Sequence, residues 1–387
     1  MHAEEEREIT PELLTELSRS LRKKSKDVIN IIVDLISVRE RIREALIQKG
    51  FLINIPENPS TDISGYAIDS SFVQALPLVV GDFFLVTAGY IRYPRAKTLR
   101  KKENAGLRVG LRLTNTVVSS MRVISSYAHI IERKIGIDLV LNEENINAIF
   151  IDGPVLPLYL YYTPETKWYE EERQLVKYTE DLIALCKEKG ITLIGVVKRV
   201  RSRFIPRGFR TILQPILGEK YSLLLDISND KSLGSLTIKN GEGIIFGKVL
   251  GEEPIYRAII SDDTFGRFAR IFLEDHPWTT EMEFAIIKPK RSRQIISVEA
   301  LDYANIGFNN ILAWINAHAT HTGCPQILDY VDRYVQITSG LIEIARRLLI
   351  KIIAEKVRES KEIDEFELIE LLLDYADLQK KYAPTMG

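Results

Sequence analysis

Three short apolar runs that end in a charged residue constrain the fold of this chain more than any other feature. They span Tyr66–Asp69, Ile149–Asp152 and Ile191–Lys198, and the first strand is expected to extend to Ser71. Their length and their content of Ile and Val are typical of buried strands. Segments with helical periodicity lie between them, from about Thr114 to Ile135 and from Glu165 to Lys189. Strands that alternate with helices predict an α/β fold, with a mixed sheet flanked by helices.

Further strands and two helical ends complete the predicted organisation. Additional strands are predicted at Leu76–Val80, Phe83–Arg92, Ser222–Leu225, Gly243–Val249, Ile255–Ile260 and Ile295–Val298. Helical stripes fill residues 10–48, opened by Thr10-Pro11, and recur over Asp329–Arg358 and Asp364–Lys381. We therefore divide the chain into an N-terminal helical arm (1–55), a central domain (56–345) and a C-terminal helical extension (346–387). The arms either pack on the core or serve a protein partner.

Composition and charge exclude several classes of protein. Lys and Arg (52) balance Asp and Glu (53), so the net charge neither favours nor excludes a nucleic-acid partner. Cys186 and Cys324 are expected to be free thiols in a reducing compartment. The acidic N-terminus is unlike a secretory signal, and every long apolar stretch is broken by a charge, so no membrane span is expected. We expect an intracellular, cytoplasmic protein.

The two aspartates that end strands are the first candidate site residues. Asp69 and Asp152 each follow an apolar strand and precede small or turn-forming residues. Ligands of open α/β sheets bind beyond the carboxyl ends of the strands, where two such side chains would lie close together. Clustered carboxylates are hard ligands for Mn²⁺ or Mg²⁺, which activate water for phosphodiester hydrolysis. One such Asp alone is more often a turn former or a helix cap.

Glu132 and Lys198 are candidates to complete the site. Glu132 lies on the predicted helix between the two strands, and Glu143 and Glu144 are alternative third carboxylates. A solvated helix charge is an almost equally good interpretation of Glu132. Lys198 ends a strand, where it would contact phosphate or stabilise developing negative charge.

Basic residues gather in three tracts although the chain as a whole is neutral. They comprise Lys198, Arg199, Arg201, Arg203, Arg207 and Arg210, then Arg92, Arg95, Lys97, Arg100, Lys101, Lys102, Arg108 and Arg112, and last Lys288, Lys290, Arg291 and Arg293. Charge runs are usually solvated faces. Here the acids concentrate elsewhere, in the first ten residues and Glu359–Asp377, which favours a basic channel for a phosphate backbone.

These motifs, in this order, resemble the NurA nucleases. The resemblance rests on Ile68–Ser71, Ile151–Pro154, Gly195–Ser202, Val298–Ala300 and Gly323–Arg333, and it covers residues 60–345. It implies a ribonuclease-H-like core, Mn²⁺-dependent endonuclease and 5′-to-3′ exonuclease activity on DNA, and a homodimer. It also implies docking on HerA, a hexameric ATPase of DNA end resection. Asp69, Asp152 and Lys198 match the family's metal-binding aspartates and lysine, and Glu132 its helix glutamate.

The C-terminal motif departs from the family pattern at two positions. Cys324 and Asp332 stand where the family typically has a tyrosine and a histidine. Asp332 retains a side chain that binds metal. His318 and His321, three residues apart, are alternative sources of an imidazole, although packing or a place on the helix surface is the favoured role for them.

Two rival functions remain open on sequence alone. One is a non-catalytic adaptor that keeps a nuclease fold as a platform for an ATPase and DNA. The other is a different ribonuclease-H-like enzyme, acting on RNA or transferring DNA strands. The sequence has no P-loop, zinc-ligand set or dinucleotide fingerprint, which disfavours an NTPase, a zinc finger or a dehydrogenase.

Overall fold

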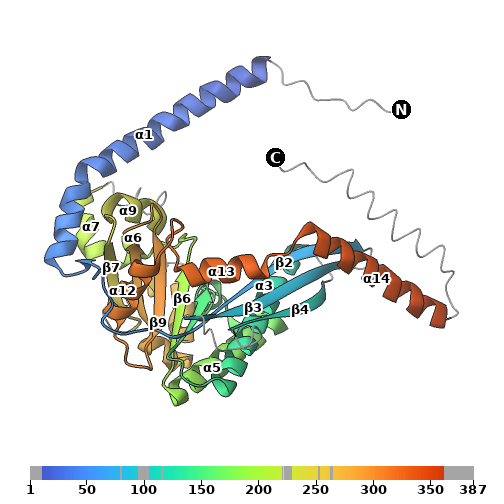
Figure 1. Cartoon of the computed structure of the whole chain (residues 1–387). Helices are drawn as coiled ribbons and strands as arrows, with labels where there is room; N and C mark the ends of the chain where they lie inside the picture. Colours follow the sequence, from blue (N-terminus) through green and yellow to red (C-terminus); the bar gives the residue numbers. More distant parts are fainter. Residues whose placement is uncertain are drawn as a thin grey trace.

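A mixed sheet forms the centre of the molecule. The computed structural model describes residues 11–78, 81–94, 104–114, 117–219, 221, 229–251, 253–261 and 265–360. In this part of the chain nine strands pair in the order β1-β7-β8-β9-β6-β5-β2-β3-β4 (Figure 1). The strands are β1 (Leu52–Asn54), β2 (Gly65–Leu78), β3 (Gly81–Tyr93), β4 (Ala105–Thr114), β5 (Ala148–Asp152), β6 (Thr192–Val197), β7 (Glu242–Lys248), β8 (Glu283–Lys288) and β9 (Ile296–Leu301).

Five of these strands have the arrangement of a ribonuclease-H-like core. β2, β3 and β4 form an antiparallel ladder, and β5 and β6 add to the free edge of β2 in parallel. Within the order β4-β3-β2-β5-β6, only β3 is reversed. This confirms the predicted α/β fold and its ribonuclease-H-like core. The extra strands β9, β8, β7 and β1 continue the sheet beyond β6 through antiparallel pairs.

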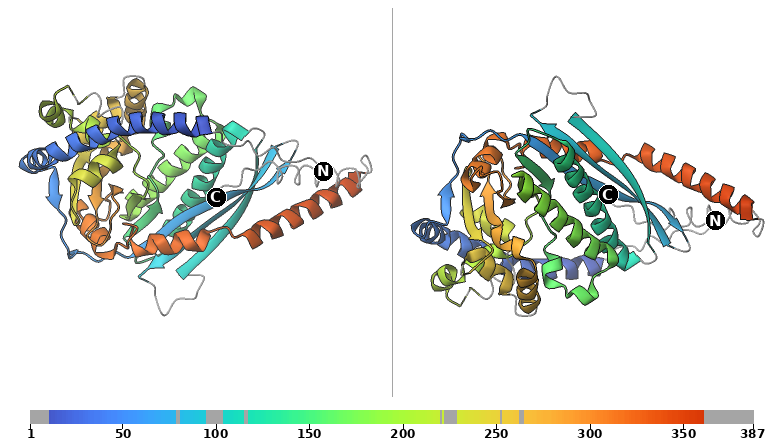
Figure 2. Two further views of the ribbon diagram at one scale, coloured as in Figure 1. Left: turned by 90° about the horizontal axis from the view of Figure 1, so that it is seen from above. Right: turned by 90° about the horizontal axis from the view of Figure 1, so that it is seen from below.

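Helices cover both faces of the sheet because its central strands are apolar on both sides. Ile68, Ile151 and Leu193 face the core beneath α3 (Val117–Asn142) and α5 (Glu170–Lys189). The alternate residues Phe150 and Val196 face α12 (Phe308–His318) and α13 (Gln326–Val335). The two views of Figure 2 show these helices on opposite sides of the strands.

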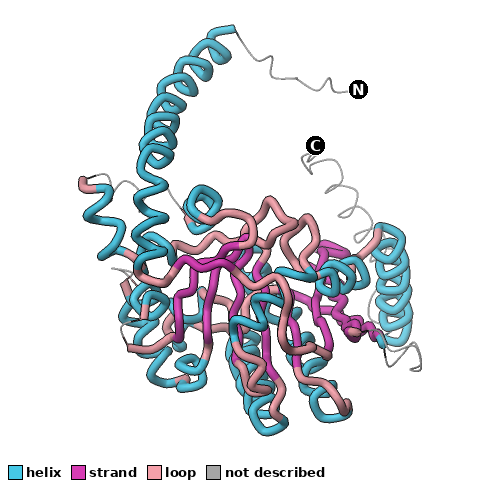
Figure 3. Tube along the Cα trace, turned by 60° about the vertical axis from the view of Figure 1, so that its left-hand side comes forward, coloured by secondary structure: helices cyan, strands magenta, loops and turns pink. Residues whose placement is uncertain are grey.

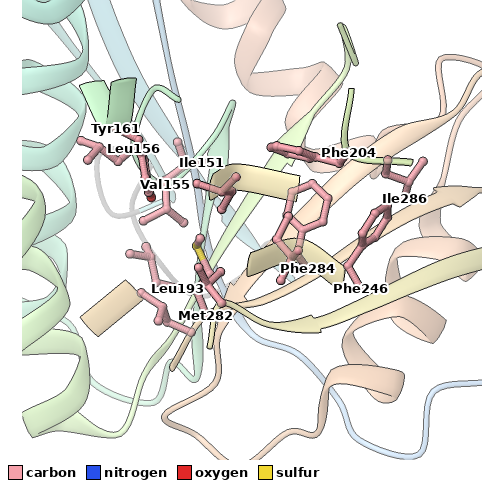
Figure 4. Packing of buried hydrophobic residues seen from close by; sticks show 14 of the residues in the cluster. Ile151, Val155, Leu156, Tyr161, Leu193, Phe204, Phe246, Met282, Phe284 and Ile286 are labelled. Carbon is pink, nitrogen blue, oxygen red and sulfur yellow. The ribbon is translucent and has the colours of Figure 1, made fainter. Parts of the chain in front are cut away.

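The first of these cores continues without a break into the added strands. Phe284 on β8 contacts Phe204 and Phe246 edge-on, at centroid distances of 5.1 and 5.4 Å. Figure 4 shows this aromatic group beside Ile151 and Val155 of the central sheet. The surrounding helices are α4 (Tyr159–Tyr162), α6 (Phe204–Gly208), α7 (Arg210–Leu217), α9 (Asp230–Thr237), α10 (Pro254–Ile260) and α11 (Gly266–Asp275), with 3₁₀ turns at Glu165–Lys167 and Pro277–Glu281.

Two long helices project from this body. The last turns of α1 (Pro11–Gln48) belong to the core, because Ile42 and Leu46 are buried there. Arg43 also binds both carboxylate oxygens of Glu242, at 2.7 and 2.8 Å. The rest of α1 extends away from the sheet, and α14 (Ser339–Ser360) leaves at the opposite end (Figures 1 and 3). Among the described residues, no helix is both long and apolar enough to cross a membrane.

Two predictions of secondary structure are wrong: one predicted strand is a helix, and one predicted helix is two helices. Ile255–Ile260 is the helix α10, not a strand, because Pro254 occupies its first turn and Ile255, Ala258 and Ile259 are buried at helical spacing. The helix predicted over Asp329–Arg358 is two helices. α13 ends at the extended residue Gln336, and the Thr338 carbonyl and hydroxyl then accept the first N–H groups of α14.

Other predictions needed smaller corrections or lie outside the described residues. The short strand predicted over Tyr66–Ser71 continues to Leu78. A bulge between Gln74 and Leu76 joins it to the next predicted run. β4 was predicted only as part of a basic tract, and β8 was missed. Cys186 and Cys324 are free thiols, as expected, and the structure shows that both are buried. The predicted strand at 222–225 and helix at 364–381 cannot be compared, since both lie outside the described ranges.

Candidate active site

The register of three parallel strands places the predicted site residues at one edge of the sheet. Ile68 on β2, Ile151 on β5 and Gly195 on β6 lie side by side, and the β2–β5 ladder ends at that row. Asp69 and Asp152 are the next residues of their strands. Because side chains alternate along a strand, Asp69 follows Ala67, and Asp152 follows Phe150, onto the α13 face.

Lys198 lies at the centre of this edge, among three carboxylates. Its Nζ is 2.5 Å from Asp152 Oδ2, 3.4 Å from Asp332 Oδ2 and 3.8 Å from Asp329 Oδ1. Burial disfavours the ammonium form, but the Asp152 carboxylate outweighs this effect and raises the pKa of Lys198 above its usual value. The lysine is therefore fully charged and holds α13 against the end of β5.

Asp69 and Asp152 have the electrostatic properties of a site that needs a cation. Burial, together with the charges of Asp152 and Glu132, raises the pKa of Asp69 to about 9. Burial also raises the pKa of Asp152 to about 6, although the Lys198 ammonium opposes the shift. A carboxylate cluster in a poorly solvated position resists full ionisation unless a positive charge joins it.

Glu132 reaches the same edge from the opposite face of the sheet. It comes from α3, is buried, and accepts hydrogen bonds from the hydroxyl of Ser70, from Nη1 of Arg133 (3.0 Å) and, in the suitable tautomer, from Nδ1 of His129 (3.1 Å). Although burial opposes ionisation, these partners hold the pKa of Glu132 below its usual value. Of the alternative carboxylates, Glu143 pairs with Arg92 at 3.1 Å and does not join this group.

The α13 side of the site contains a residue that the sequence interpretation missed. Asp329 is buried and accepts hydrogen bonds from the hydroxyls of Thr320 (2.5 Å) and Thr322 (3.0 Å). Its position one helical turn before Asp332 places both near Lys198. This spacing of two acids was the available sequence signal. Asp332 itself is largely exposed, at 62%.

The other residues of the C-terminal motif have structural environments. Cys324 is buried in the core beneath α12 and α13. His318 stacks on Trp314 and hydrogen-bonds the hydroxyl of Tyr93 at 2.9 Å, so the favoured packing role is correct. His321 is exposed, and its carbonyl accepts a hydrogen bond from Ser292.

The basic tracts differ in how far the structure leaves their side chains exposed or pairs them with acids. Arg199, Arg201 and Arg203 follow Lys198 directly and are exposed. Arg108 and Arg112 instead form ion pairs with Asp138 on α3 and Glu171 on α5. Acids beside these arginines neutralise part of the tract that the sequence assigned to DNA. Its other candidates, Arg95, Lys101 and Lys102, lie outside the described residues.

The donor set fits a hard divalent cation. Carboxylate oxygens from Asp69, Asp152, Glu132 and Asp332 are the ligands that Mn²⁺ and Mg²⁺ prefer. Among the described residues, no three Asp, Glu, His or Cys side chains already surround a metal position. Lys198 instead provides the positive charge beside Asp152. Burial and then the charges of Asp152 and Glu132 raise the pKa of Asp69, and a bound cation would offset both effects.

This chain has a ribonuclease-H-like sheet with acids and a lysine at the carboxyl ends of its central strands. These features place it in the class of proteins with a nuclease fold. Residues 65–337 match the NurA domain, and the chain belongs to the NurA family of nucleases. None of the curated proteins matches the chain in sequence.

Solved structures of NurA proteins share this fold. The NurA nuclease from Sulfolobus solfataricus aligns with 90% of this chain and 98% of its own, at 12% identity and a TM-score of 0.52. NurA with manganese aligns with 90% of this chain and 99% of its own, at 13% identity and a TM-score of 0.50. NurA bound to dAMP and manganese aligns with 87% of this chain and 96% of its own, at 11% identity and a TM-score of 0.50.

Asp69→Asn is expected to stabilise the metal-free protein at pH 8 and to weaken its stabilisation by Mn²⁺. The folded-state pKa of about 9 exceeds the ordinary value of 3.8, so folded Asp69 keeps a proton that the unfolded chain loses. This carboxyl therefore costs stability progressively as the pH rises from 4 to 9, whereas Asn carries no such cost. Thermal unfolding at pH 5 and pH 8 should show a higher Tm than for the wild type, with the larger rise at pH 8. The rise is expected to be about 1 °C per kcal/mol for a chain of this length.

The control for this experiment is Asp181→Asn, an exposed position on α5. It should leave both the Tm and the response to Mn²⁺ unchanged. A lower Tm for Asp69→Asn at pH 8, or an undiminished Mn²⁺ shift, would show that the carboxyl is not held in a repulsive metal-binding cluster.

Proposed function

We propose that this chain is a Mn²⁺-dependent deoxyribonuclease that cuts single-stranded DNA internally and degrades it from the 5′ end. The observation that carries the proposal is the convergence of Asp69, Asp152 and Lys198 at one edge of the central sheet. Membership of the NurA family supports it, and so do the solved NurA structures that contain manganese, one of them with dAMP. Mg²⁺ is the alternative metal.

Each site residue has a distinct role in this proposal. Asp69 and Asp152 would hold the metal, with Glu132 and Asp332 as further ligands. When bound, Mn²⁺ lowers the pKa of a water molecule and neutralises charge on the phosphate. The Lys198 ammonium, 2.5 Å from Asp152, is placed to stabilise negative charge that develops on the phosphate.

A non-catalytic adaptor is the competing function. The departures at Cys324 and Asp332, together with the ion pair between Lys198 and Asp152, favour it. The retained pair of aspartates, of which Asp69 is buried and Asp152 half-buried, opposes it, because a binding platform has no need for a costly carboxylate cluster.

The DNA path is proposed to run over the exposed loop after β6 and along α13. Arg199, Arg201 and Arg203 leave the site on this loop, and Arg95, Lys101 and Lys102 are proposed from sequence alone to extend the surface. On the side of α13 away from Lys198, Tyr330 and Tyr334 line a cavity of about 770 Å³ with the facing ends of β3 and β4. Aromatic rings beside cationic residues favour single-stranded DNA, whose bases stack on such surfaces.

A homodimer is proposed to form over the edge of the sheet. Four alternate residues of β4 expose apolar side chains on the face that carries Asp69: Leu107, Val109, Leu111 and Leu113, at 45, 58, 50 and 40%. On α14, Ile344, Leu348 and Ile352 are 57, 55 and 53% exposed at intervals of four residues, which places them on one helix face. Rows of exposed apolar side chains of this kind are typical of a protein interface.

A HerA-type hexameric ATPase is the proposed partner in DNA end resection and double-strand break repair at the nucleoid. Family membership supports this role. The projecting part of α1 also carries exposed apolar residues at helical spacing, Ile29, Val33 and Ile36. Such a stripe is typical of a helix that packs on another protein.

Substitutions at the three central residues should abolish cleavage. Asp69→Asn, Asp152→Asn and Lys198→Met are each expected to lower the cleavage rate by roughly 100-fold or more, because each removes a metal ligand or a charge that stabilises the transition state. The measurement is Mn²⁺-dependent degradation of end-labelled single- and double-stranded DNA, with and without the ATPase, and Asp181→Asn is the matched control. Failure of the wild type to cut in every condition would favour the adaptor.

Removal of the exposed arginines should weaken binding to the same extent for every DNA sequence. Arg199→Ala combined with Arg201→Ala is expected to reduce the slope of log affinity against log salt by about 0.7 for each phosphate of single-stranded DNA that these arginines neutralise. Fluorescence anisotropy without divalent metal measures this slope. Lys239→Ala, an exposed change beside β7, is the control. An unchanged slope would place the backbone path elsewhere.

A charge in the exposed apolar face should disrupt the dimer. Val109→Lys is expected to shift sedimentation equilibrium from dimer to monomer, since the lysine would be desolvated at the interface. Ile271→Lys on α11 introduces the same charge at a position that is 53% exposed, close to the 58% of Val109, and should leave the dimer intact. A monomeric wild type, or a variant that remains dimeric, would contradict this interface.

A further inference from the structure

The turn directly after Asp152 is fixed to the neighbouring strand by its backbone. Gly153 has a φ of 130°, and its N–H donates to the carbonyl of Val196 at 2.9 Å. Gly195 on β6 lies under this turn, where a Cβ atom would come within 2.8 Å of the Gly153 oxygen and 3.0 Å of the Val155 nitrogen. Only a glycine at 195 allows the turn to pack this closely on the sheet.

Side chains from two other elements hold the same turn from opposite sides. Oε2 of Glu299, on β9, accepts the Val155 N–H at 2.8 Å. Nη2 of Arg133, on α3, donates to the carbonyls of Val155 at 2.8 Å and Pro154 at 3.2 Å. The Val155 side chain is fully buried beside Ile151 (Figure 4), so its peptide groups depend on these partners for hydrogen bonds.

Arg133 also binds a second part of the site. Its Nη1 donates to Glu132 Oε2 at 3.0 Å, so one guanidinium spans the turn after Asp152 and the carboxylate of Glu132. Arg133 is completely buried, and its Nε has no hydrogen-bond partner among the described residues. A buried cation with an unsatisfied donor contributes little net stability. Its geometry, in contrast, suits a group that sets the distance between two functional carboxylates.

We propose that Arg133 and Glu299 form a clamp, with Arg133 as the positioning residue that fixes the Asp152 turn relative to Glu132. This inference rests on the proposed nuclease function and adds residues to which no role has been assigned. The clamp acts through the ligands and touches neither DNA nor the reacting atoms. Displacement of a reacting group by about 1 Å can cost roughly 100-fold in rate, so a backbone held from both sides has a direct catalytic value.

Arg133→Lys tests the clamp because lysine keeps the charge beside Glu132 but cannot span both partners. Two readouts apply to the purified full-length protein. Amide hydrogen exchange of peptides that cover residues 150–157 should accelerate, and exchange of β8 should not change. The Kd for Mn²⁺, measured by calorimetry, should rise roughly 10- to 100-fold. Excess Mn²⁺ should restore most of the cleavage rate in Arg133→Lys but not in Asp152→Asn.

Arg122→Lys is the matched control. Arg122 lies on the same helix and also binds a carboxylate through two nitrogens, each 2.9 Å from Glu172, but it does not contact the turn. Both readouts should stay at wild-type values in this variant. A lower Tm for Arg133→Lys, with unchanged exchange at 150–157 and unchanged Mn²⁺ affinity, would overturn the proposal and leave Arg133 with a purely structural role.

Glu299 provides a second test if Arg133→Lys does not fold. Glu299→Gln keeps an oxygen that accepts the Val155 N–H and should retain slow exchange at 150–157, whereas Glu299→Ala should exchange faster. Equal exchange in the two variants would overturn the clamp. A wild type that binds Mn²⁺ without cutting DNA would refute the proposed function alone, since the exchange data would still report on the clamp.

Discussion

The parallel register of β2, β5 and β6 is the constraint on which the site depends. Ile68, Ile151 and Gly195 lie in one row, so the residues that follow them emerge at the same level of the sheet. A slip of one residue in either ladder would move an aspartate to the opposite face, because side chains alternate along a strand. Gly65 protects this register, since a Cβ there would lie 1.7 Å from the Ala148 oxygen.

The same register concentrates negative charge where solvent cannot screen it. Asp69 is 8% exposed and Asp152 has a side-chain exposure of 12%, so their repulsion and desolvation both oppose ionisation. Lys198 supplies positive charge beside Asp152 on one face, and Arg133 pairs with Glu132 on the other. This edge carries an electrostatic cost, whereas the preceding residues of β2, β5 and β6, such as Ile68, Ile151 and Ile194, are buried and apolar. Local conflicts of this kind are typical of functional sites.

The sequence alone was enough to predict the site residues that end strands, but few of the residues that support them. Asp69, Asp152 and Lys198 could be found because each follows an apolar strand of its own. Arg133 and Glu299 act through contacts between segments distant in sequence, and no local pattern indicates this role. Asp329 was missed although its spacing from Asp332 was an available signal. β4 was missed because arginine and glycine alternate with its apolar residues. The segment was therefore interpreted as part of a basic tract and not as a strand. In α10, the apolar run from Ile255 matches a strand as well as a helix until burial distinguishes them.

The altered C-terminal motif changes the surroundings of Lys198 more than those of Asp69 and Asp152. Cys324 is withdrawn into the core, whereas Asp332 and Asp329 both approach Nζ of Lys198. Lys198 therefore keeps the Asp329 carboxylate on α13 beside it if a cation binds Asp152 and Asp332. In a site with no acids on α13, that exchange would leave the ammonium without a partner in a half-buried position, at a cost in free energy. Asp329 lowers this cost, and Asp332 keeps an oxygen that can bind metal, so the departure at position 332 is compatible with a working metal site.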